Sequence, residues 1–212
     1  VVADGALEIR ARNGRRPHLV LSALTISGAA DSACRLNGLL ISGAPLQVPA
    51  AGGNALARLE LHHCTLVPGI ALDASGQPLQ ANVPSLQLEI ASLQTLLASC
   101  LVGAIRAHEH AALVASDSLI DACARDAVAF TLIGKLHTSE IGLISNSILF
   151  AALAPGDSWA VPVRAARKQV GCVRFSWLPF DSIVPRRHRC QPASASAARH
   201  IAPRFTALRY GT

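Results

Sequence analysis

The sequence predicts an all-β fold, a right-handed parallel β-helix of about eight coils that ends in an irregular C-terminal cap segment. Three observations carry this prediction: a recurring apolar hexad, alternating strands that precede many of the hexads, and a small aliphatic composition. Of the 212 residues, 51% are hydrophobic and only 4% are aromatic. Such small side chains suit thin, repeated layers better than one thick globular core.

Each hexad has two aliphatic residues in its middle and a Gly or Ala at its end. The six hexads lie at residues 23–28, 38–43, 64–69, 99–104, 117–122 and 146–151. The intervals between their last residues average about 25 residues, which is too short for a helix-pair repeat. Unequal intervals with a constant strand indicate a coil whose loops differ in length.

Alternating segments supply the other predicted strands. They lie at residues 59–62, 86–90, 105–108 and 136–138. Their apolar residues are expected to face the core while Glu, His and Arg face solvent, as in a half-buried strand. Polar or turn-rich loops are expected at residues 49–54, 73–84 and 155–159. A doubly wound α/β fold is disfavoured, because the best helix candidate, residues 122–129, is too short to connect parallel strands.

The coils are expected over residues 1–160, and the last coil or coils with an Arg-rich segment over residues 161–212. The chain begins Val1-Val2-Ala3-Asp4, contains no Met and shows no signal peptide, so we expect a piece of a longer protein. No apolar run reaches about 18 residues, so we expect no membrane span.

The net charge of +6 comes almost entirely from Arg, and much of it lies after residue 160. The predicted contact region consists of Arg174, Arg186, Arg187 and Arg189. Nucleic-acid binding is one interpretation of this cluster. It is disfavoured because few aromatic side chains accompany the arginines for stacking on bases. A solvated cap, or a docking surface for an acidic partner, is the preferred interpretation.

Six cysteines occur, but no CxxC pair is present and their spacing matches no zinc module. Cys172 and Cys190 are the candidate pair for a disulfide, because both lie in the irregular C-terminal segment. The alternative is that the cysteines serve as compact hydrophobic residues within the coils.

Several motifs together resemble a family of uncharacterised bacterial parallel β-helix proteins. They lie at residues 59–69, 116–122, 134–138 with 145–148, 167–176 and 184–192. The resemblance covers about residues 56–212, and the last two motifs are the most specific. It implies a chain that continues beyond residue 212, and some family members are encoded near phage-tail-like or contractile-injection genes. The family supplies no catalytic residues.

Candidate chemistry in the sequence is sparse. Asp117 and Asp121 flank one strand at a separation of about 13 Å, too far for a glycosidase pair, and are better explained as solvated turn residues. His62, His108 and His110 suggest a metal, but a polar outer face explains them better, and no metal is expected. Neither a nucleophile elbow nor a phosphate-binding glycine loop occurs, so we expect no catalytic residue and no cofactor.

The expected function is a non-catalytic structural or interaction module of a larger bacterial assembly. Its expected partners are flanking domains of its own longer chain or other subunits of the assembly. The alternative is a β-helix that binds or cleaves polysaccharide, with a face lined by carboxylates and aromatic residues.

Overall fold

The computed structural model describes residues 1–125, 129–132, 140–152, 163 and 171–206. The regular structure of these residues is nearly all β-strand. Its helical elements are a short 3-10 helix, η1 (Ala51–Gly53), and a single helical turn, α1 (Ala195–Ala198). Neither is long or apolar enough to cross a membrane. The prediction of an all-β chain built from parallel sheets is confirmed.

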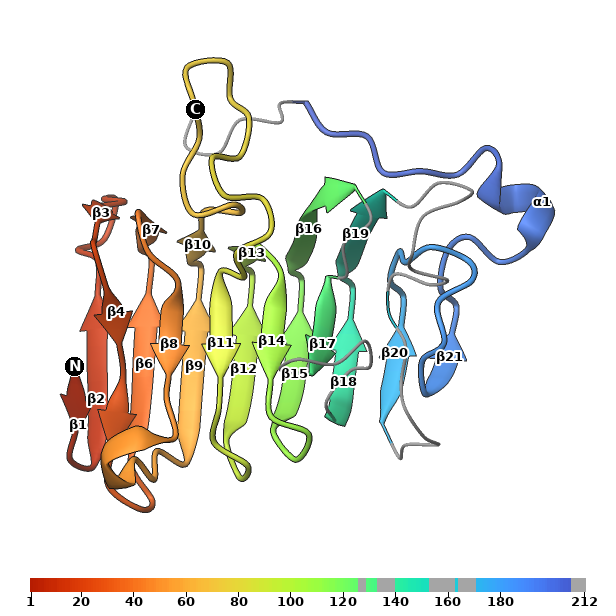
Figure 1. The fold of residues 1–212 in the computed structure, drawn as a ribbon. Coiled ribbons are helices and arrows are strands. Elements are labelled where there is room, and N and C mark those ends of the chain that lie inside the picture. Colours follow the sequence, from red (N-terminus) through yellow and green to blue (C-terminus); the bar gives the residue numbers. More distant parts are fainter. Residues whose placement is uncertain (126–128, 133–139, 153–162, 164–170, 207–212) are drawn as a thin grey trace.

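Three parallel sheets contain most of the strands (Figure 1). The largest has, in spatial order, β2 (Ala6–Arg10), β6 (Ala33–Asn37), β9 (Arg58–His62), β12 (Gln94–Ala98), β15 (Ala112–Ser116), β18 (Glu140–Ser145), β20 (Cys172–Arg174) and β21 (Arg186–His188). The six-stranded sheet has β3 (His18–Val20), β7 (Leu40–Ser42), β10 (Thr65–Leu66), β13 (Leu101–Val102), β16 (Leu119–Arg125) and β19 (Ile148–Ala152). The five-stranded sheet has β4 (Leu24–Thr25), β8 (Leu46–Val48), β11 (Leu86–Leu88), β14 (Ile105–Ala107) and β17 (Phe130–Leu132). A two-stranded sheet pairs β1 (Val2–Ala3) with β5 (Ser27–Gly28).

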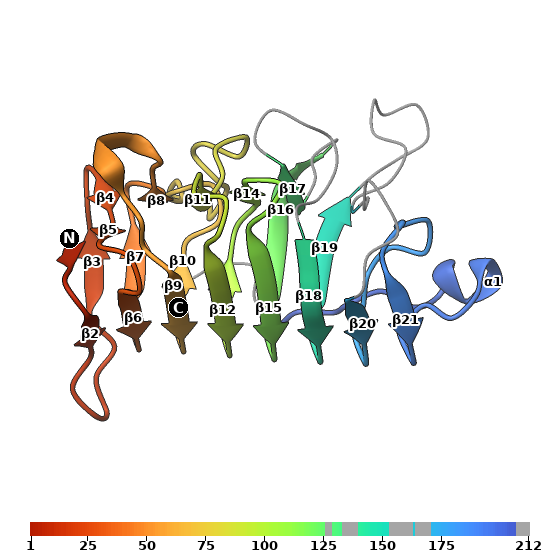
Figure 2. The same cartoon turned by 90° about the horizontal axis from the view of Figure 1, so that it is seen from below.

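The chain visits the three large sheets in rotation. After β6 it passes through β7 and β8, and only then returns to the first sheet as β9, beside β6. Figure 2 shows the strands of the largest sheet side by side, from β2 at one end to β21 at the other. Because neighbouring strands are parallel, none can pair with its own continuation, and each circuit takes its backbone hydrogen bonds from adjacent circuits.

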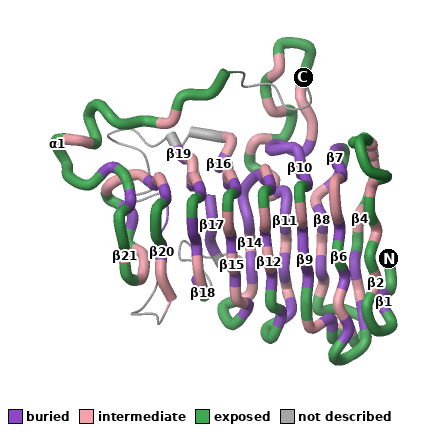
Figure 3. Tube along the Cα trace, turned by 180° about the vertical axis from the view of Figure 1, so that it is seen from behind, coloured by how far each residue is buried: buried purple, intermediate pink, exposed green. Residues whose placement is uncertain are grey.

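The register of these strands stacks their inward side chains into apolar columns. One column of the eight-stranded sheet contains Ile9, Leu36, Leu61, Leu97, Ala115, Ile144 and Val173. One column of the six-stranded sheet contains Leu19, Ile41, Leu66, Val102, Ile120 and Leu149. Buried residues alternate with less buried ones along β6, β12 and β15 of the eight-stranded sheet (Figure 3). Burying one such aliphatic side chain contributes about 1.5–3 kcal/mol, so the columns are a main source of stability.

The corner between the eight-stranded and six-stranded sheets has the same design in seven circuits. One residue has left-handed backbone, with φ between 49° and 73°, and a buried residue follows it. The left-handed residues are Gly38, His63, Ser99, Asp117, Asn146, Phe175 and Arg189. The buried residues after them are Leu39, Cys64, Cys100, Ser118, Ser147, Ser176 and Cys190. Left-handed backbone costs a residue other than glycine about 1–2 kcal/mol, so the corners need compensating interactions.

Hydrogen bonds made by the small buried residue provide this compensation. The hydroxyls of Ser118, Ser147 and Ser176 each donate to the carbonyl oxygen two residues earlier, at 2.7 Å. The Ser147 hydroxyl also accepts from the backbone N–H of Ser118 in the preceding circuit, at 3.2 Å. The Cys64 and Cys100 thiols donate to the equivalent carbonyls at 3.2 and 3.3 Å. Each small residue therefore closes its own corner, and each serine hydroxyl also accepts a backbone N–H of the preceding circuit.

Five of the six predicted hexads lie at this corner, which explains why they share two aliphatic residues in their middle. The exception is the hexad at residues 23–28, whose first strand, β4, belongs to the five-stranded sheet. Two further corners, Phe175-Ser176 and Arg189-Cys190, lie in the segment that was expected to depart from the hexad. Strands β20 and β21 of that segment extend the largest sheet.

The other expected elements have mixed outcomes. Residues 59–62, 86–88 and 105–107 are strands as predicted, in β9, β11 and β14, but β11 and β14 belong to the five-stranded sheet. The helix candidate at 122–129 begins inside β16. The predicted strand at 136–138 and loop at 155–159 lie outside the described residues.

The last described segment, residues 199–206 after α1, returns along the six-stranded sheet. The indole N–H of Trp177 donates to the carbonyl of Ile201 at 3.2 Å, and the rings of Phe150 and Phe205 meet edge to face at 5.5 Å. Trp177 itself continues this sheet through isolated parallel bridges to Ile148 and Gln191. The returning segment thus covers the C-terminal part of the six-stranded sheet.

Replacing Ser147 by alanine is expected to lower the free energy of unfolding by about 1–3 kcal/mol, because the buried N–H of Ser118 loses its acceptor. Urea denaturation measures the loss. Ser147→Cys is the matched control, since cysteine occupies this position at Cys64 and Cys100. Equal losses in the two variants would contradict a hydrogen-bonding role for the corner.

Replacing Thr95 by valine is expected to raise the free energy of unfolding by about 1 kcal/mol. Thr95 points inward between Leu59 and Leu113, is 2% exposed, and its hydroxyl has no hydrogen-bond partner in the described part of the chain. Thr65→Val is the control, because the Thr65 hydroxyl is equally buried but accepts from Arg16. Thermal and urea unfolding of both variants measures the difference between them. Thr95→Val should be the more stable of the two, and the opposite order would contradict the prediction.

Candidate functional site

The outward face of the eight-stranded sheet carries a cluster of charged side chains centred on Glu60. Arg35 projects from β6, while Arg58, Glu60 and His62 project from β9 at every second residue. Alternation of side chains along a strand places these three on one face. The register of β6 against β9 then sets Arg35 directly beside Glu60. The neighbouring surface is a shallow pocket lined in part by Arg58, Glu60 and Gln94.

Glu60 is the best-connected carboxylate of this face. Its Oε2 accepts from Nε of Arg35 at 2.7 Å, and Nη2 of the same guanidinium lies at the same distance. Nε2 of His62 lies 3.3 Å from Oε2, and Nη1 of Arg58 lies 3.7 Å from Oε1. Glu60 is only 8% exposed, so its charge requires these partners.

The surroundings keep Glu60 ionised. Burial by itself would raise the pKa of this carboxyl, but the hydrogen bonds from Arg35 and His62, together with their charges, outweigh burial and lower the pKa below its ordinary value. The same hydrogen bond and the Glu60 charge raise the pKa of Arg35. The cluster is therefore a charged network at neutral pH.

This geometry does not suit acid–base catalysis by Glu60. A general acid needs a proton at working pH, whereas the pKa of Glu60 is lowered. The carboxylate in the same register column is Glu8, two strands away at about 9–10 Å, and Arg35 lies between the two. The order Glu8, Arg35, Glu60 is an alternating ladder of charge, which stabilises neighbouring strands by cross-strand attraction.

The four predicted contact arginines do not form one surface. Arg174 and Arg186 are exposed on the outward side of β20 and β21. Arg189 is exposed at the corner that follows β21. Arg187 instead pairs in register with the buried Val173, so it lies in the inward column, where its guanidinium donates to the carbonyl of Ser182. The four arginines are near one another along the chain. Because side chains alternate along a strand, Arg174 and Arg186 point outward while Arg187 points inward.

The predicted Cys172–Cys190 disulfide is not formed, and both residues are free thiols. Register sets Cys172 opposite Arg186, whereas Cys190 lies four residues further on, past the next corner. The Cys190 thiol donates to the carbonyl of Val173 at 3.3 Å. Burial raises the pKa of the Cys100 thiol to about 11, which fits the alternative that cysteines serve as compact buried residues.

The histidines and aspartates considered for metal or glycosidase chemistry are dispersed. His62 contacts Glu60, whereas His108 and His110 lie in the turn after β14, with ring centroids 5.7 Å apart. No group of three or more His, Cys, Asp or Glu residues that could hold a metal occurs in the described part of the chain. Asp117 occupies a corner, and Asp121 Oδ1 accepts from the N–H of Cys123 on β16.

The Glu60 cluster was not predicted from the sequence. Arg35 and Glu60 are 25 residues apart, close to the average hexad interval, and both lie in alternating segments. The alternation marks both side chains as outward, and the 25-residue spacing is that of two neighbouring circuits. Only the strand register identifies them as partners.

Comparison with protein-family models, with curated proteins and with solved structures gives no match for this chain. The resemblance to bacterial β-helix proteins therefore stays a prediction.

Replacing Glu60 by glutamine is expected to lower the free energy of unfolding at neutral pH by about 1 kcal/mol, a modest loss because Arg35 is half exposed. Since the folded-state pKa of Glu60 is lowered, its ion pairs stabilise the chain fully above the ordinary value of 4.5, and this stabilisation is lost as pH falls through the lower folded pKa. The variant should thus lose less stability than the parent on acidification. Urea titrations between pH 7 and pH 3 measure this, with the exposed Glu109→Gln as control.

Proposed function

We propose that the chain is a non-catalytic structural and interaction module whose three sheets form a right-handed parallel β-helix. The observation that carries this proposal is the parallel register that runs from β2 to β21 through eight strands. Such stacking makes a stiff body, since each circuit is held by its neighbours on both sides. Stiff scaffolds with variable loops are suited to spacing and docking, because the frame is fixed while the loops carry recognition.

The segment between β10 and β11 supports an interaction role. It projects from the corner beyond the six-stranded sheet (Figure 1). Within it an antiparallel bridge joins Leu72 to Pro78, and Asp73 Oδ1 accepts from the N–H groups of Ser75 and Gln77. Leu79 is 60% exposed in this ordered loop. Loops that project from a fixed frame are the usual place for recognition.

The outward face of the eight-stranded sheet supports a scaffold better than a sugar site. Its described strands contain no Phe, Tyr or Trp that a sugar ring could stack on. The carboxylate Glu60 is occupied by ion pairs. The exposed Arg174 and Arg186 suit an acidic partner instead, which we propose to be a flanking domain of a longer chain or another subunit of an assembly.

The test uses hydrogen exchange of the 212-residue chain alone and with polygalacturonate as the acidic polysaccharide. A scaffold should show slow hydrogen exchange in the strands of all three sheets, and the polymer should add no protection. The ultraviolet absorbance of the mixture should not rise, because no unsaturated product of polymer cleavage forms. Protection of β6, β9 and β12 by the polymer would overturn the scaffold in favour of sugar binding. A rise in absorbance that Glu60→Gln abolishes would overturn the non-catalytic assignment.

A further inference from the structure

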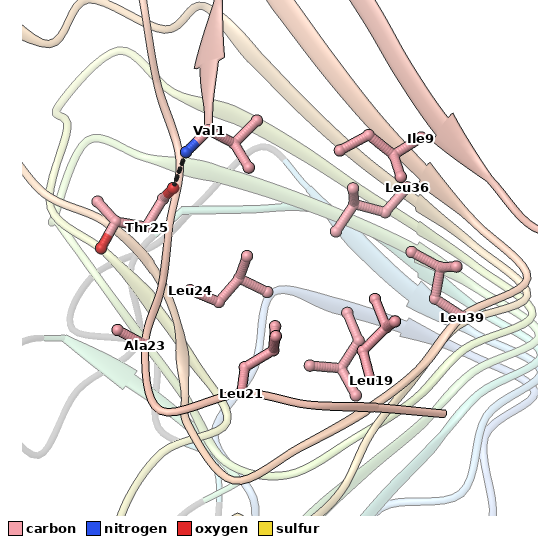
Figure 4. Close-up of a pocket in the computed structure, with 10 residues that line it drawn as sticks. Val1, Ile9, Leu19, Leu21, Ala23, Leu24, Thr25, Leu36 and Leu39 are labelled. Carbon is pink, nitrogen blue, oxygen red and sulfur yellow. Dashed lines mark hydrogen bonds between the residues drawn. The ribbon is translucent and has the colours of Figure 1, made fainter. Parts of the chain in front are cut away.

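The corner between β2 and β3 differs from the later corners of the stack. Residues 11–17 stand where the next circuit has only Gly38 and Leu39. They form a loop that projects beyond the end of β2 (Figure 2). The chain then rejoins the stack at β3, and Leu19 lines the apolar interior with Leu36 and Leu39 (Figure 4). The loop is therefore an insertion that leaves the inward column in register.

An Asn-Gly pair occupies the tip of this loop. The N–H of Arg15 donates to the carbonyl of Arg12 at 2.9 Å and closes a turn around Asn13 and Gly14. Gly14 has left-handed backbone, with φ of 71°, and Asn13 is exposed. Apart from chain neighbours, a side-chain carbon placed on Gly14 would meet no atom within 4 Å. Within the described part of the chain, neither Asn13 nor Gly14 takes part in a hydrogen bond. Strand pairing along β2 involves residues 6–10 and does not reach this turn.

Asparagine followed by glycine can react with its own backbone. The Gly14 nitrogen gives up its proton and bonds to the Cγ carbon of Asn13, while the Asn13 side-chain nitrogen leaves as ammonia and carries that proton away. The product is a succinimide ring. Water then opens the ring at either carbonyl and leaves aspartate or isoaspartate, in which the main chain runs through Cγ. Glycine favours the attack because it has no side chain to hinder the nitrogen and its backbone rotates freely.

The second Asn-Gly pair of the sequence, Asn37-Gly38, is held by the stack. The Asn37 carbonyl accepts from the N–H of Ala11, and the Gly38 N–H donates to the carbonyl of His62, both at 2.9 Å. Both polar groups of the peptide unit that joins Asn37 to Gly38 are therefore bound. The Gly38 nitrogen cannot reach Cγ of Asn37 until these bonds open, and such local opening between stacked strands costs free energy. The two pairs share their residues but differ in their backbone hydrogen bonds.

We propose that Asn13 is a modification site, at which the exposed turn converts asparagine into aspartate and isoaspartate while Asn37 stays intact. The product carries a carboxylate and lowers the net charge of +6 by one. Exposed arginines flank the turn on both sides, at Arg10, Arg12, Arg15 and Arg16. The charge of this projecting loop thus changes with the age of the protein. The inference is independent of the proposed scaffold function, since it needs only the loop and water.

Peptide mass spectrometry of the 212-residue chain, after incubation in mildly alkaline buffer, tests the proposal. Asn13 should convert about tenfold faster than Asn37 or more, since tenfold corresponds to only about 1.4 kcal/mol of local opening. In guanidinium chloride the stack unfolds, so the two pairs should convert at similar rates. Gly14→Ala places a methyl group beside the attacking nitrogen and should slow conversion at Asn13 several-fold, while the rate at Asn37 stays unchanged.

Several outcomes would overturn the proposal. They are equal rates at the two pairs in the folded chain, a faster rate at Asn37, or a rate at Asn13 that Gly14→Ala leaves unchanged. A difference that persists in guanidinium chloride would assign the cause to neighbouring sequence instead of the fold, and would overturn it too. Circular dichroism of Gly14→Ala checks that the β-structure is kept, and an unchanged rate at Asn37 shows that the stack around Gly38 is intact.

Discussion

Parallel stacking is the constraint on which the rest of this structure depends. A parallel strand cannot hydrogen-bond to its own continuation, so every circuit obtains its backbone partners and its apolar cover from adjacent circuits. A lasting slip of one residue would turn an inward column outward. Where the register shifts between β15 and β18, at Leu113 and Val114, the pairing continues with Ala115 opposite Ile144, so both stay in the inward column. The repeated corner helps to keep the register: a left-handed residue turns the chain from the eight-stranded into the six-stranded sheet, and the hydrogen bond of Ser147 or its equivalent holds that corner.

The same register decides which charges the fold tolerates. Glu60 is nearly buried on the outward face, and it is stable there because β6 brings Arg35 to 2.7 Å. Arg187 shows the opposite case, since its place in the inward column is acceptable only at the last strand, where no described circuit follows. Burial lowers the pKa of its guanidinium, and its hydrogen bond to Ser182 partly compensates.

The inward columns of the three sheets differ in chemistry. The described column of the five-stranded sheet is apolar throughout, with Leu24, Leu46, Leu86, Ile105 and Phe130 in register. The column of the eight-stranded sheet is aliphatic from Ile9 to Val173 but has Arg187 in β21. The position of a side chain in the register thus decides whether it joins an apolar column, whatever its own polarity.

The sequence by itself determined the all-β class, the parallel sheets and five of the corner hexads, because two aliphatic residues next to a small one report directly on a buried strand and its turn. It also marked Glu60 and His62 as outward residues through the alternation of the segment 59–62. Only the tertiary structure decided which circuits are neighbours, and hence that Arg35 meets Glu60, that Arg187 turns inward, and that Cys172 and Cys190 remain apart. The physical reason is loop length: the loops between strands vary, so distance along the chain does not give the register, and the register alone sets which side chains touch.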